Sequence, residues 1–468
     1  MKKGNPIYAF PDAKQKAFVE LSETEKRILS RHQKTIITWS IIASFSYALI
    51  WYWFPSVDSF IGAQFSLSAF QIGLLISSFG AAFILTNFLW GHLNDEYWPN
   101  RTVTVGLIIA GLSTFLFVRS TDIQEMYMYR VLEGVFNGAA WSGLVKTVQL
   151  WFPIEKRSKY ISVFVAIYSW AISVDLFAGI HVASAYSWML WAEIVGTIGI
   201  ISGITTYFMA KPFGPMIGLP LIEWGDVSPI HKLKFKTSAR ALFRQKWMIL
   251  AILSGLVVIG GANIISGIYL QQVLPTIQGI PISQIAILGT VWGAMQGVLI
   301  LVFGHLSDKY RRRVLFVKLG LLGAFISMIG VVLTIVFHPL PMYLIYLITI
   351  STGTPFLIAG PIFALLGDRY GVLLVGAAAA YFEGFGTGGG AFLLPLLLGY
   401  MTAPFGMAVA WGVIAAIFLV VFLAWLPQKE YKITNSLVDI HTLNMEKAEK
   451  RMELGIAIED SMDKYEGE

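Results

Sequence analysis

The sequence Gly91-His92-Leu93-Asn94-Asp95 occurs twice in this chain, the second time as Gly304-His305-Leu306-Ser307-Asp308. The two copies are 213 residues apart, and the same offset carries Glu155-Lys156 onto Asp368-Arg369. Chance does not readily produce several matches with one common offset, so this pattern indicates an internal duplication. The chain is therefore predicted to fold as two similar halves.

Long apolar runs fill both halves. The chain has 468 residues, of which 56% are hydrophobic and 13% are charged, whereas a soluble protein carries about 25% charged residues. A helix needs about 20 residues to cross a bilayer, and a barrel strand only about ten. The runs long enough for helices are 35–57, 69–91, 101–119, 123–150, 159–183, 187–210, 247–274, 282–304, 312–338, 341–367, 371–400 and 403–427. The sequence predicts an all-α membrane protein with twelve transmembrane helices in two pseudo-symmetric, parallel six-helix halves.

Polar segments flank and separate these halves. We expect a cytoplasmic amphipathic head at 1–34, a six-helix bundle at 35–210, a cytoplasmic link at 211–246, a second six-helix bundle at 247–427 and a cytoplasmic tail at 428–468. Lys and Arg are concentrated in the head, link and tail, so the positive-inside rule places both termini in the cytoplasm. The head lacks a signal-peptide cleavage pattern, and we expect the first span to direct insertion of a multi-pass plasma-membrane protein. Within the head, Ser22 and Glu25 have the spacing of a capping box, which predicts the start of a helix.

The sequence also lacks the motifs of several functional classes. It contains no Cys, which excludes disulfides, thiolate metal sites and catalytic thiols. It has no phosphate-binding loop and no His-Glu-x-x-His or Gly-x-Ser-x-Gly motif, so we expect no enzyme, no metal and no cofactor. The glycines of 384–390 match Gly-x-Gly-x-x-Gly, but no strand precedes them, and a helix bend beside Glu383 is the better interpretation. The basic residues behind the net charge of +6 are scattered, so no nucleic-acid partner is expected.

The repeated motif resembles the signature of the major facilitator superfamily, in which Gly-x-x-x-Asp and a basic cluster follow the second and eighth spans. The resemblance covers essentially 35–427, and its motif residues are Gly91, Asp95, Gly304, Asp308, Lys309, Arg312 and Arg313. It implies a gate, because glycines let helices approach closely and aspartates can bind helix N-termini and arginines on the cytoplasmic side. A static salt bridge that fixes the loop is the alternative. The fourth span resembles the family pattern as well, with Arg130 followed by Gly134, Gly138 and Gly143.

Charged residues within the predicted spans are candidates for function, because a charge in a membrane is costly unless it is paired or hydrated. At about 1.5 Å per residue, Arg130 and Glu133 lie about 10 and 15 Å into the fourth span, and Glu383 lies about 18 Å into the eleventh. Arg130, Glu133 and Asn137 share one helix face. Asp175 belongs to the outer half of the fifth span.

The resemblance also implies which side chains face a solute. Spans 1, 4, 7 and 10 of the family line a central cavity, which makes Tyr47 and Asn263 further candidates for solute binding. Our hypothesis is that Arg130 attracts an anionic group or pairs alternately with Glu133, and that Glu133 or Glu383 accepts a coupling proton. The alternatives are a structural ion pair and, for Glu383, a neutral acid hydrogen-bonded within the bundle.

These features predict a secondary carrier that moves a small solute by alternating access. We expect proton-coupled uptake of an organic anion or a sugar-like metabolite by a monomer surrounded by membrane lipids. Proton-antiport efflux and uniport are alternatives within this class. A solute-sensing membrane receptor is the alternative from another class, although the tail at 428–468 is short for an output domain.

Overall fold

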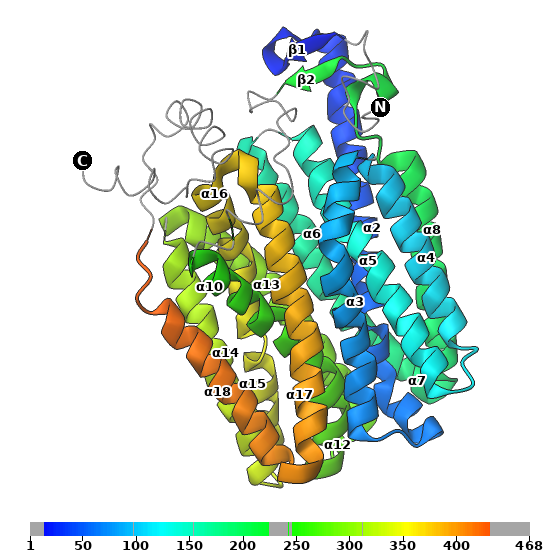
Figure 1. The fold of residues 1–468 in the computed structure, drawn as a ribbon, viewed down its shortest axis with the longest axis vertical. Helices are drawn as coiled ribbons and strands as arrows, with labels where there is room; N and C mark the ends of the chain where they lie inside the picture. Colours follow the sequence, from blue (N-terminus) through cyan, green and yellow to red (C-terminus); the bar gives the residue numbers. More distant parts are fainter. Residues whose placement is uncertain are drawn as a thin grey trace.

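The fold is known from a computed structural model that describes residues 14–96, 98–152, 154–223, 242, 246–310 and 312–430. Other residues, and some side chains within helices, lie outside this description. Almost all of the described chain is helical, and the helices stand side by side in one elongated bundle (Figure 1). The prediction of an all-α membrane protein with two six-helix halves is confirmed.

The first half matches the six predicted spans closely. Its helices are α2 (Glu23–Phe65), α3 (Ala69–Glu96), α4 (Pro99–Phe117), α5 (Ile123–Trp151), α6 (Ile154–Val174), α7 (Ile180–Ala185) and α8 (Trp188–Met209). A π-helical turn, η2 (Asp175–Gly179), joins α6 to α7, so these two helices form one span. The capping box is confirmed, because the Ser22 hydroxyl accepts from the Glu25 amide and the Glu25 carboxylate accepts from the Ser22 amide.

Helices of the second half are interrupted more often. The seventh span consists of α10 (Lys246–Gly255), η4 (Leu256–Gly260), α11 (Gly261–Asn263), η5 (Ile264–Val273) and α12 (Leu274–Ile277). The others are built from α13 (Ile282–Tyr310), α14 (Arg313–Val336), α15 (Met342–Ser351), η6 (Thr354–Ile358), α16 (Ala359–Tyr381), η7 (Phe382–Gly388), α17 (Gly389–Phe405) and α18 (Met407–Trp425). Segments η4, η5 and η7 are π-helical, and such turns are frequent at functional sites. Helix α16 continues through 368–370, which the sequence predicts to be a connector between two spans.

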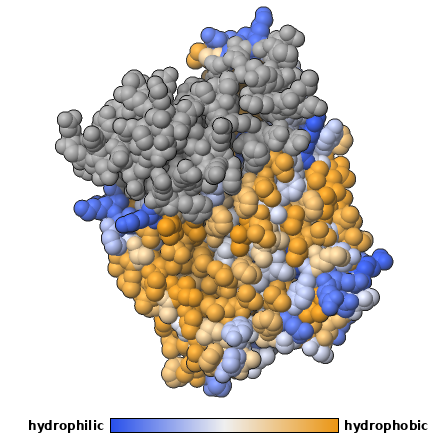
Figure 2. Space-filling model, viewed as in Figure 1, coloured by the Kyte–Doolittle hydropathy of each residue, from blue (hydrophilic) through white to orange (hydrophobic). Residues whose placement is uncertain are grey.

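An apolar belt surrounds the bundle. Within the described residues, eleven helices are long and apolar enough to cross a membrane. Helix α5 has 29 residues and is long enough as well, but it carries Glu125, Arg130, Glu133 and Lys146. Figure 2 shows hydrophobic residues covering the middle of the visible face and hydrophilic residues near its ends. On α5, Arg130 and Glu133 are buried, whereas Met128 and Val131 are exposed, so the helix turns these two charged side chains into the bundle.

Two short strands and two 3-10 turns form a cap that the sequence did not predict. They are β1 (Gln15–Ala17), η1 (Phe18–Glu20), η3 (Gly214–Ile217) and β2 (Leu221–Glu223). The two strands pair in parallel at the end of the bundle where α2 begins, which we call the head end (Figure 1). Below them, the Lys211 carbonyl accepts hydrogen bonds from His32 Nε2 at 3.1 Å and Trp151 Nε1 at 2.8 Å. The start of the link is thereby attached to the first half.

Glycines bring the two halves into close contact. A Cβ atom on Gly80 of α3 would lie 2.6 Å from the Phe392 amide nitrogen of α17. A Cβ atom on Gly293 of α13 would lie 2.6 Å from the Ser173 hydroxyl of α6. At the opposite end from the head, which we call the far end, Ser59 donates to the Gln271 side chain at 3.0 Å. The halves therefore meet through α3 with α17, α6 with α13 and α2 with η5.

Candidate functional site

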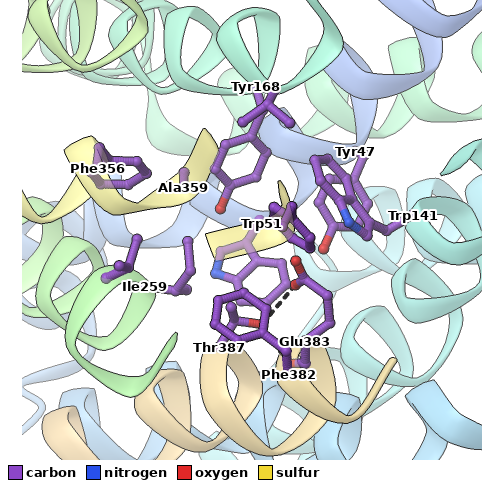
Figure 3. Close-up of a pocket in the computed structure, with 13 residues that line it drawn as sticks. Tyr47, Trp51, Trp141, Tyr168, Ile259, Phe356, Ala359, Phe382, Glu383 and Thr387 are labelled. Carbon is purple, nitrogen blue, oxygen red and sulfur yellow. Dashed lines mark hydrogen bonds between the residues drawn. The ribbon is translucent and has the colours of Figure 1, made fainter. Parts of the chain in front are cut away.

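A cavity lies between the two halves, in the middle of the bundle (Figure 3). The first half lines it with Tyr47, Trp51, Trp141, Val165 and Tyr168, and the second half with Val258, Ile259, Phe356, Ala359, Phe363, Phe382, Glu383 and Thr387. Its volume of about 40 Å³ accommodates a few water molecules, since one water needs about 10–15 Å³ measured in this way. A larger solute requires the halves to separate.

Glu383 is the acid of this cavity. It lies in the π-helical segment η7, where an extra residue per turn interrupts the regular α-helical register. The Thr387 hydroxyl donates to Glu383 Oε2 at 2.8 Å, and Figure 3 shows the carboxylate pointing into the cavity near Tyr47. No Lys, Arg or His is among the residues that line the cavity in the described part of the chain. Among the residues that the structure describes, the Glu383 carboxylate therefore has no basic partner in the cavity wall.

Aromatic rings from the first half form the opposite wall. The Tyr47 ring centroid lies 5.8 Å from that of Trp51, 5.2 Å from that of Trp141 and 5.9 Å from that of Tyr168. The Trp51 indole donates to Asn263 Oδ1 at 3.2 Å, which connects the two halves behind the cavity. Of these residues the sequence had singled out Tyr47 and Asn263. Trp141 carried no sequence signal beyond its apolar surroundings.

Arg130 and Glu133 form a buried ion pair on α5, separate from the cavity lining. The Arg130 guanidinium lies between two rings, 5.0 Å from the Phe54 centroid and 4.9 Å from the Phe79 centroid. Glu133 also accepts from the Trp53 indole at 3.1 Å and the Thr114 hydroxyl at 2.7 Å. Such contacts satisfy both charged groups within the first half. The sequence predicts their pairing, but not the enclosure by aromatic rings.

The other predicted polar residues lie apart from the cavity. Asn137 donates to the Tyr47 carbonyl at 3.2 Å, so it fixes α5 against α2. Asp175 is fully buried in η2. Trp191 lies near it, but neither carboxylate oxygen accepts a hydrogen bond of normal geometry from the described residues.

Asp58 is a buried acid that the sequence did not reveal. The predicted first span ended at residue 57, whereas α2 continues to Phe65. Asp58 is fully buried at the far end, where a Cβ atom on Gly267 of η5 would lie 3.0 Å from its Oδ2. Gln272 lies near it, but neither oxygen accepts a hydrogen bond of normal geometry from the described residues. The apolar pattern of the sequence continues through Ile61, and this pattern could have shown that Asp58 belongs to the first span.

Replacing Asp58 with Asn tests whether its charge opposes packing of the far end. Ionisation of a buried, unpaired carboxyl favours the unfolded chain, so the unsubstituted protein loses stability as the pH rises and the variant does not. We expect the variant to be more stable at pH 8 than the unsubstituted protein, by about 1–3 kcal/mol, and the difference to shrink at pH 5. Thermal unfolding in detergent measures this. Glu193→Gln serves as control, because Glu193 lies on α8 and is partly exposed. An Asp58→Asn effect that is equal at both pH values contradicts the prediction.

The repeated motif lies at the head end of α3 and α13. A Cβ atom on Gly360 would lie 3.2 Å from Gly304 Cα, so α13 and α16 approach closely there. Lys309 lies 5.7 Å from the Tyr310 ring centroid, Arg312 is exposed, and Arg313 begins α14. The helical backbone places Gly91 and Asp95 on α3 and Asp308 on α13. The side chains of Asp95 and Asp308 lie outside the described part of the structure, so the predicted gate stays a prediction.

The chain matches one sequence family along almost its whole helical part. Residues 39–276 and 254–439 each match the family profile described as Major Facilitator Superfamily. The first match covers the first half and extends through the seventh span, and the second begins within that span and covers the rest of the second half. A solved structure with this fold is that of a bacterial homologue of the human lysosomal transporter Spinster in an inward-facing, unoccupied conformation, with a TM-score of 0.64, 15% identity and coverage of 85% of this chain and 97% of the other.

Curated relatives match over shorter stretches. The hexuronate transporter of Bacillus subtilis (strain 168) is 28% identical over 178 residues, which are 37% of this chain and 42% of the relative. A probable hexose phosphate transport protein of Chlamydia muridarum is 26% identical over 160 residues, 33% of this chain and 34% of the relative. The probable galactarate/D-glucarate transporter of Escherichia coli (strain K12) is 24% identical over 157 residues, 32% of this chain and 35% of the relative. The alignments span less than half the length of these relatives.

Proposed function

Because the chain belongs to the major facilitator superfamily, we propose that it is a secondary carrier which moves a small organic solute by alternating access and couples this movement to protons through Glu383. The observation that carries the proposal is a carboxylate in a cavity to which both halves contribute, with no Lys, Arg or His in the described part of its lining. A low-dielectric site favours the neutral acid, and hydration on opening favours the carboxylate. The group can therefore bind a proton in one state and release it in another.

Glu383 suits this role better than Glu133. Glu133 is already neutralised by Arg130 and accepts from Trp53 and Thr114, so protonation would disrupt a satisfied network. Glu383 accepts from the Thr387 hydroxyl, its one side-chain donor within the described residues, and faces the cavity. The proposal therefore assigns a structural role to the Arg130–Glu133 pair and the coupling role to Glu383.

Two solute classes follow from the sequence, an organic anion and a sugar-like metabolite. The names of the relatives, which include a hexuronate transporter and a probable galactarate/D-glucarate transporter, support both. Binding of an anion requires a positive group, and Arg130 is held by Glu133, Phe54 and Phe79 outside the cavity lining. Aromatic walls can also stack on a sugar ring, so the test includes both solute classes. It must also distinguish proton-coupled transport from uniport and exchange.

The proposal includes an orientation. Helix α2 begins at the head end, and α18 ends on the same side (Figure 1). We propose that this side is cytoplasmic, because the head, link and tail carry most of the Lys and Arg. The chain would then be a monomer of the plasma membrane that contacts lipids through its apolar belt, with 1–34, 211–246 and 428–468 in the cytoplasm.

Proton coupling can be tested in liposomes that contain a trapped pH dye. Carboxylates, sugars and amines are added in turn under an imposed proton gradient, and internal pH and solute uptake are recorded together. We expect one solute class to move protons, and Glu383→Gln to reduce this movement to the level of protein-free liposomes because its amide cannot accept a proton. Glu193→Gln, the same change outside the cavity, retains the movement.

Two results contradict this proposal. Proton movement that persists in Glu383→Gln shows that another group carries the proton. Solute flux without any proton movement in the unsubstituted chain indicates a uniporter, with its acids as structural groups.

A further inference from the structure

We infer that the head end of α2 binds an anionic phospholipid, whose headgroup lies against Arg31 and Lys34 and whose acyl chain lies along the exposed residues that follow them. The inference goes beyond the proposed function, because it concerns neither Glu383 nor the transported solute. It assigns a partner of stated chemistry to a surface outside the cavity.

One face of α2 stays exposed through the first part of its span. Arg31, Lys34, Thr38 and Ile42 are exposed, and Phe45 is partly exposed. Their spacing of three or four residues places these five side chains in one line along the helix, which we call the α2 strip. The strip therefore joins two basic groups to a largely apolar surface.

Neighbouring spans border the strip on both sides. The Trp39 indole donates to Thr206 of α8 at 2.9 Å, and the Ser44 hydroxyl donates to the Phe164 carbonyl of α6 at 2.6 Å. Helical geometry places Trp39 and Ser44 on opposite sides of the strip. Leu49 continues the line of the strip and is fully buried, and nearer the far end η2 and α7 contact α8. The strip is thus exposed only in the half of the span nearer the head end.

The length of the strip matches one leaflet of a bilayer. The predicted first span begins at Thr35, and the helix rises about 15 Å between Thr35 and Phe45. This is half of a hydrocarbon core of about 30 Å. Lys34 lies at the edge of this core and Arg31 about one turn above it, where the phosphates of that leaflet lie. A phospholipid in this leaflet therefore meets basic groups at its headgroup and apolar side chains along its acyl chain.

The charge of the strip selects the kind of lipid. Glu23 and Glu25 of the head are each paired with a lysine 2.9 Å away. Arg31 and Lys34 make no ion pair with any residue that the structure describes. Basic side chains beside a membrane surface attract anionic lipids, and arginine can bind a phosphate through two hydrogen bonds. The strip therefore favours a lipid with a net negative headgroup over a zwitterionic one.

Thermal unfolding of the purified full chain in mixed micelles tests this inference. Dioleoylphosphatidylglycerol, dioleoylphosphatidylcholine and sn-glycerol 3-phosphate are added in separate titrations. We expect phosphatidylglycerol to raise the midpoint temperature at a mole fraction about tenfold lower than phosphatidylcholine requires, and glycerol phosphate to have no effect. Equal titrations of the two lipids, or no stabilisation by phosphatidylglycerol, overturn the inference. Stabilisation by glycerol phosphate indicates a site for a free anion and overturns it as well.

Arg31→Gln with Lys34→Gln tests the basic groups. We expect this double variant to need about tenfold more phosphatidylglycerol for half of the effect, with an unchanged phosphatidylcholine titration. Arg27→Gln with Lys429→Gln is the matched control, since both residues are exposed. Arg27 lies about 10 Å beyond Lys34 along α2, and Lys429 belongs to the other half. If the two double variants respond alike to phosphatidylglycerol, the inference is wrong.

Thr38→Trp tests the acyl chain without a change of charge. The indole would occupy the part of the strip on which the chain lies, and the chain would lose its contacts there. We expect about fivefold more phosphatidylglycerol to be needed for half of the effect. Val105→Trp is the control, because Val105 of α4 is also exposed but lies outside the strip. If these two variants give the same titration, no lipid chain lies on α2 and the inference is wrong.

Discussion

Replacing Arg130 with Met lowers the free energy of unfolding by about 3–5 kcal/mol, the cost of leaving a buried charge without its partner. In this variant Glu133 stays enclosed on α5 with the Trp53 indole and the Thr114 hydroxyl as its donors. Neither donor carries a positive charge. The Met side chain fills much of the space between the Phe54 and Phe79 rings, so the loss reports chiefly the missing charge.

Thermal and denaturant unfolding in detergent measure this effect. Arg119→Met is the matched control, because Arg119 is exposed and such surface changes stay within about 0.5 kcal/mol. The double variant Arg130→Met with Glu133→Gln should recover part of the stability, since neither side chain of the pair is then charged. If the Arg130→Met variant is as stable as the unsubstituted chain, Glu133 is neutral and Arg130 is available to bind a solute.

Replacing Gly80 with Leu should disrupt the contact between the two halves and thereby lower transport. This is the second of the two large effects that we expect. The new Cβ atom would lie 2.6 Å from the Phe392 amide nitrogen and 2.7 Å from the Ala391 carbonyl carbon. Both are backbone atoms of α17, so a side-chain rotation cannot relieve the overlap. Overpacking of this kind costs about 1–3 kcal/mol, which changes the population of a state in which α3 and α17 touch by about 5–150-fold.

Transport rates in liposomes and thermal unfolding of the same preparations test the Gly80 prediction. We expect transport to fall by a similar factor, because alternating access requires the contact to form in each cycle. Gly412→Leu is the matched control, since a Cβ atom there meets nothing within 4 Å. Unchanged transport in Gly80→Leu would show that α3 and α17 are already apart in the states that limit the rate.

The fold was largely predictable because a bilayer imposes strong rules on the sequence. Apolar runs predicted the spans, and the repeated motif at Gly91 and Gly304 predicted two halves. Non-α turns were less predictable. The glycines after Glu383 indicated a bend, but whether it becomes a π-helix depends on packing against neighbouring helices.

The site was predictable only in its residue types. Arg130, Glu133 and Glu383 all lie near the middle of a predicted span, and depth alone cannot tell which faces a cavity. Which of these residues faces the cavity depends on the rotation of each helix about its axis. Side chains such as Asn137, whose amide donates to the Tyr47 carbonyl, fix this rotation. Trp141 was missed because an aromatic residue within an apolar run has the same pattern whether it faces a cavity, the core or lipid.

Pairing of β1 with β2 changes where the chain can be divided into two polypeptides. Hydrophobicity alone places the end of the first half near Met209. The first half nevertheless binds the Lys211 carbonyl and pairs β1 with β2, so its structure extends to Glu223. A break at residue 211 would separate the first half from a strand and a carbonyl that it binds. Separately expressed halves should therefore be divided after Glu223, so that each fragment keeps the contacts formed within it.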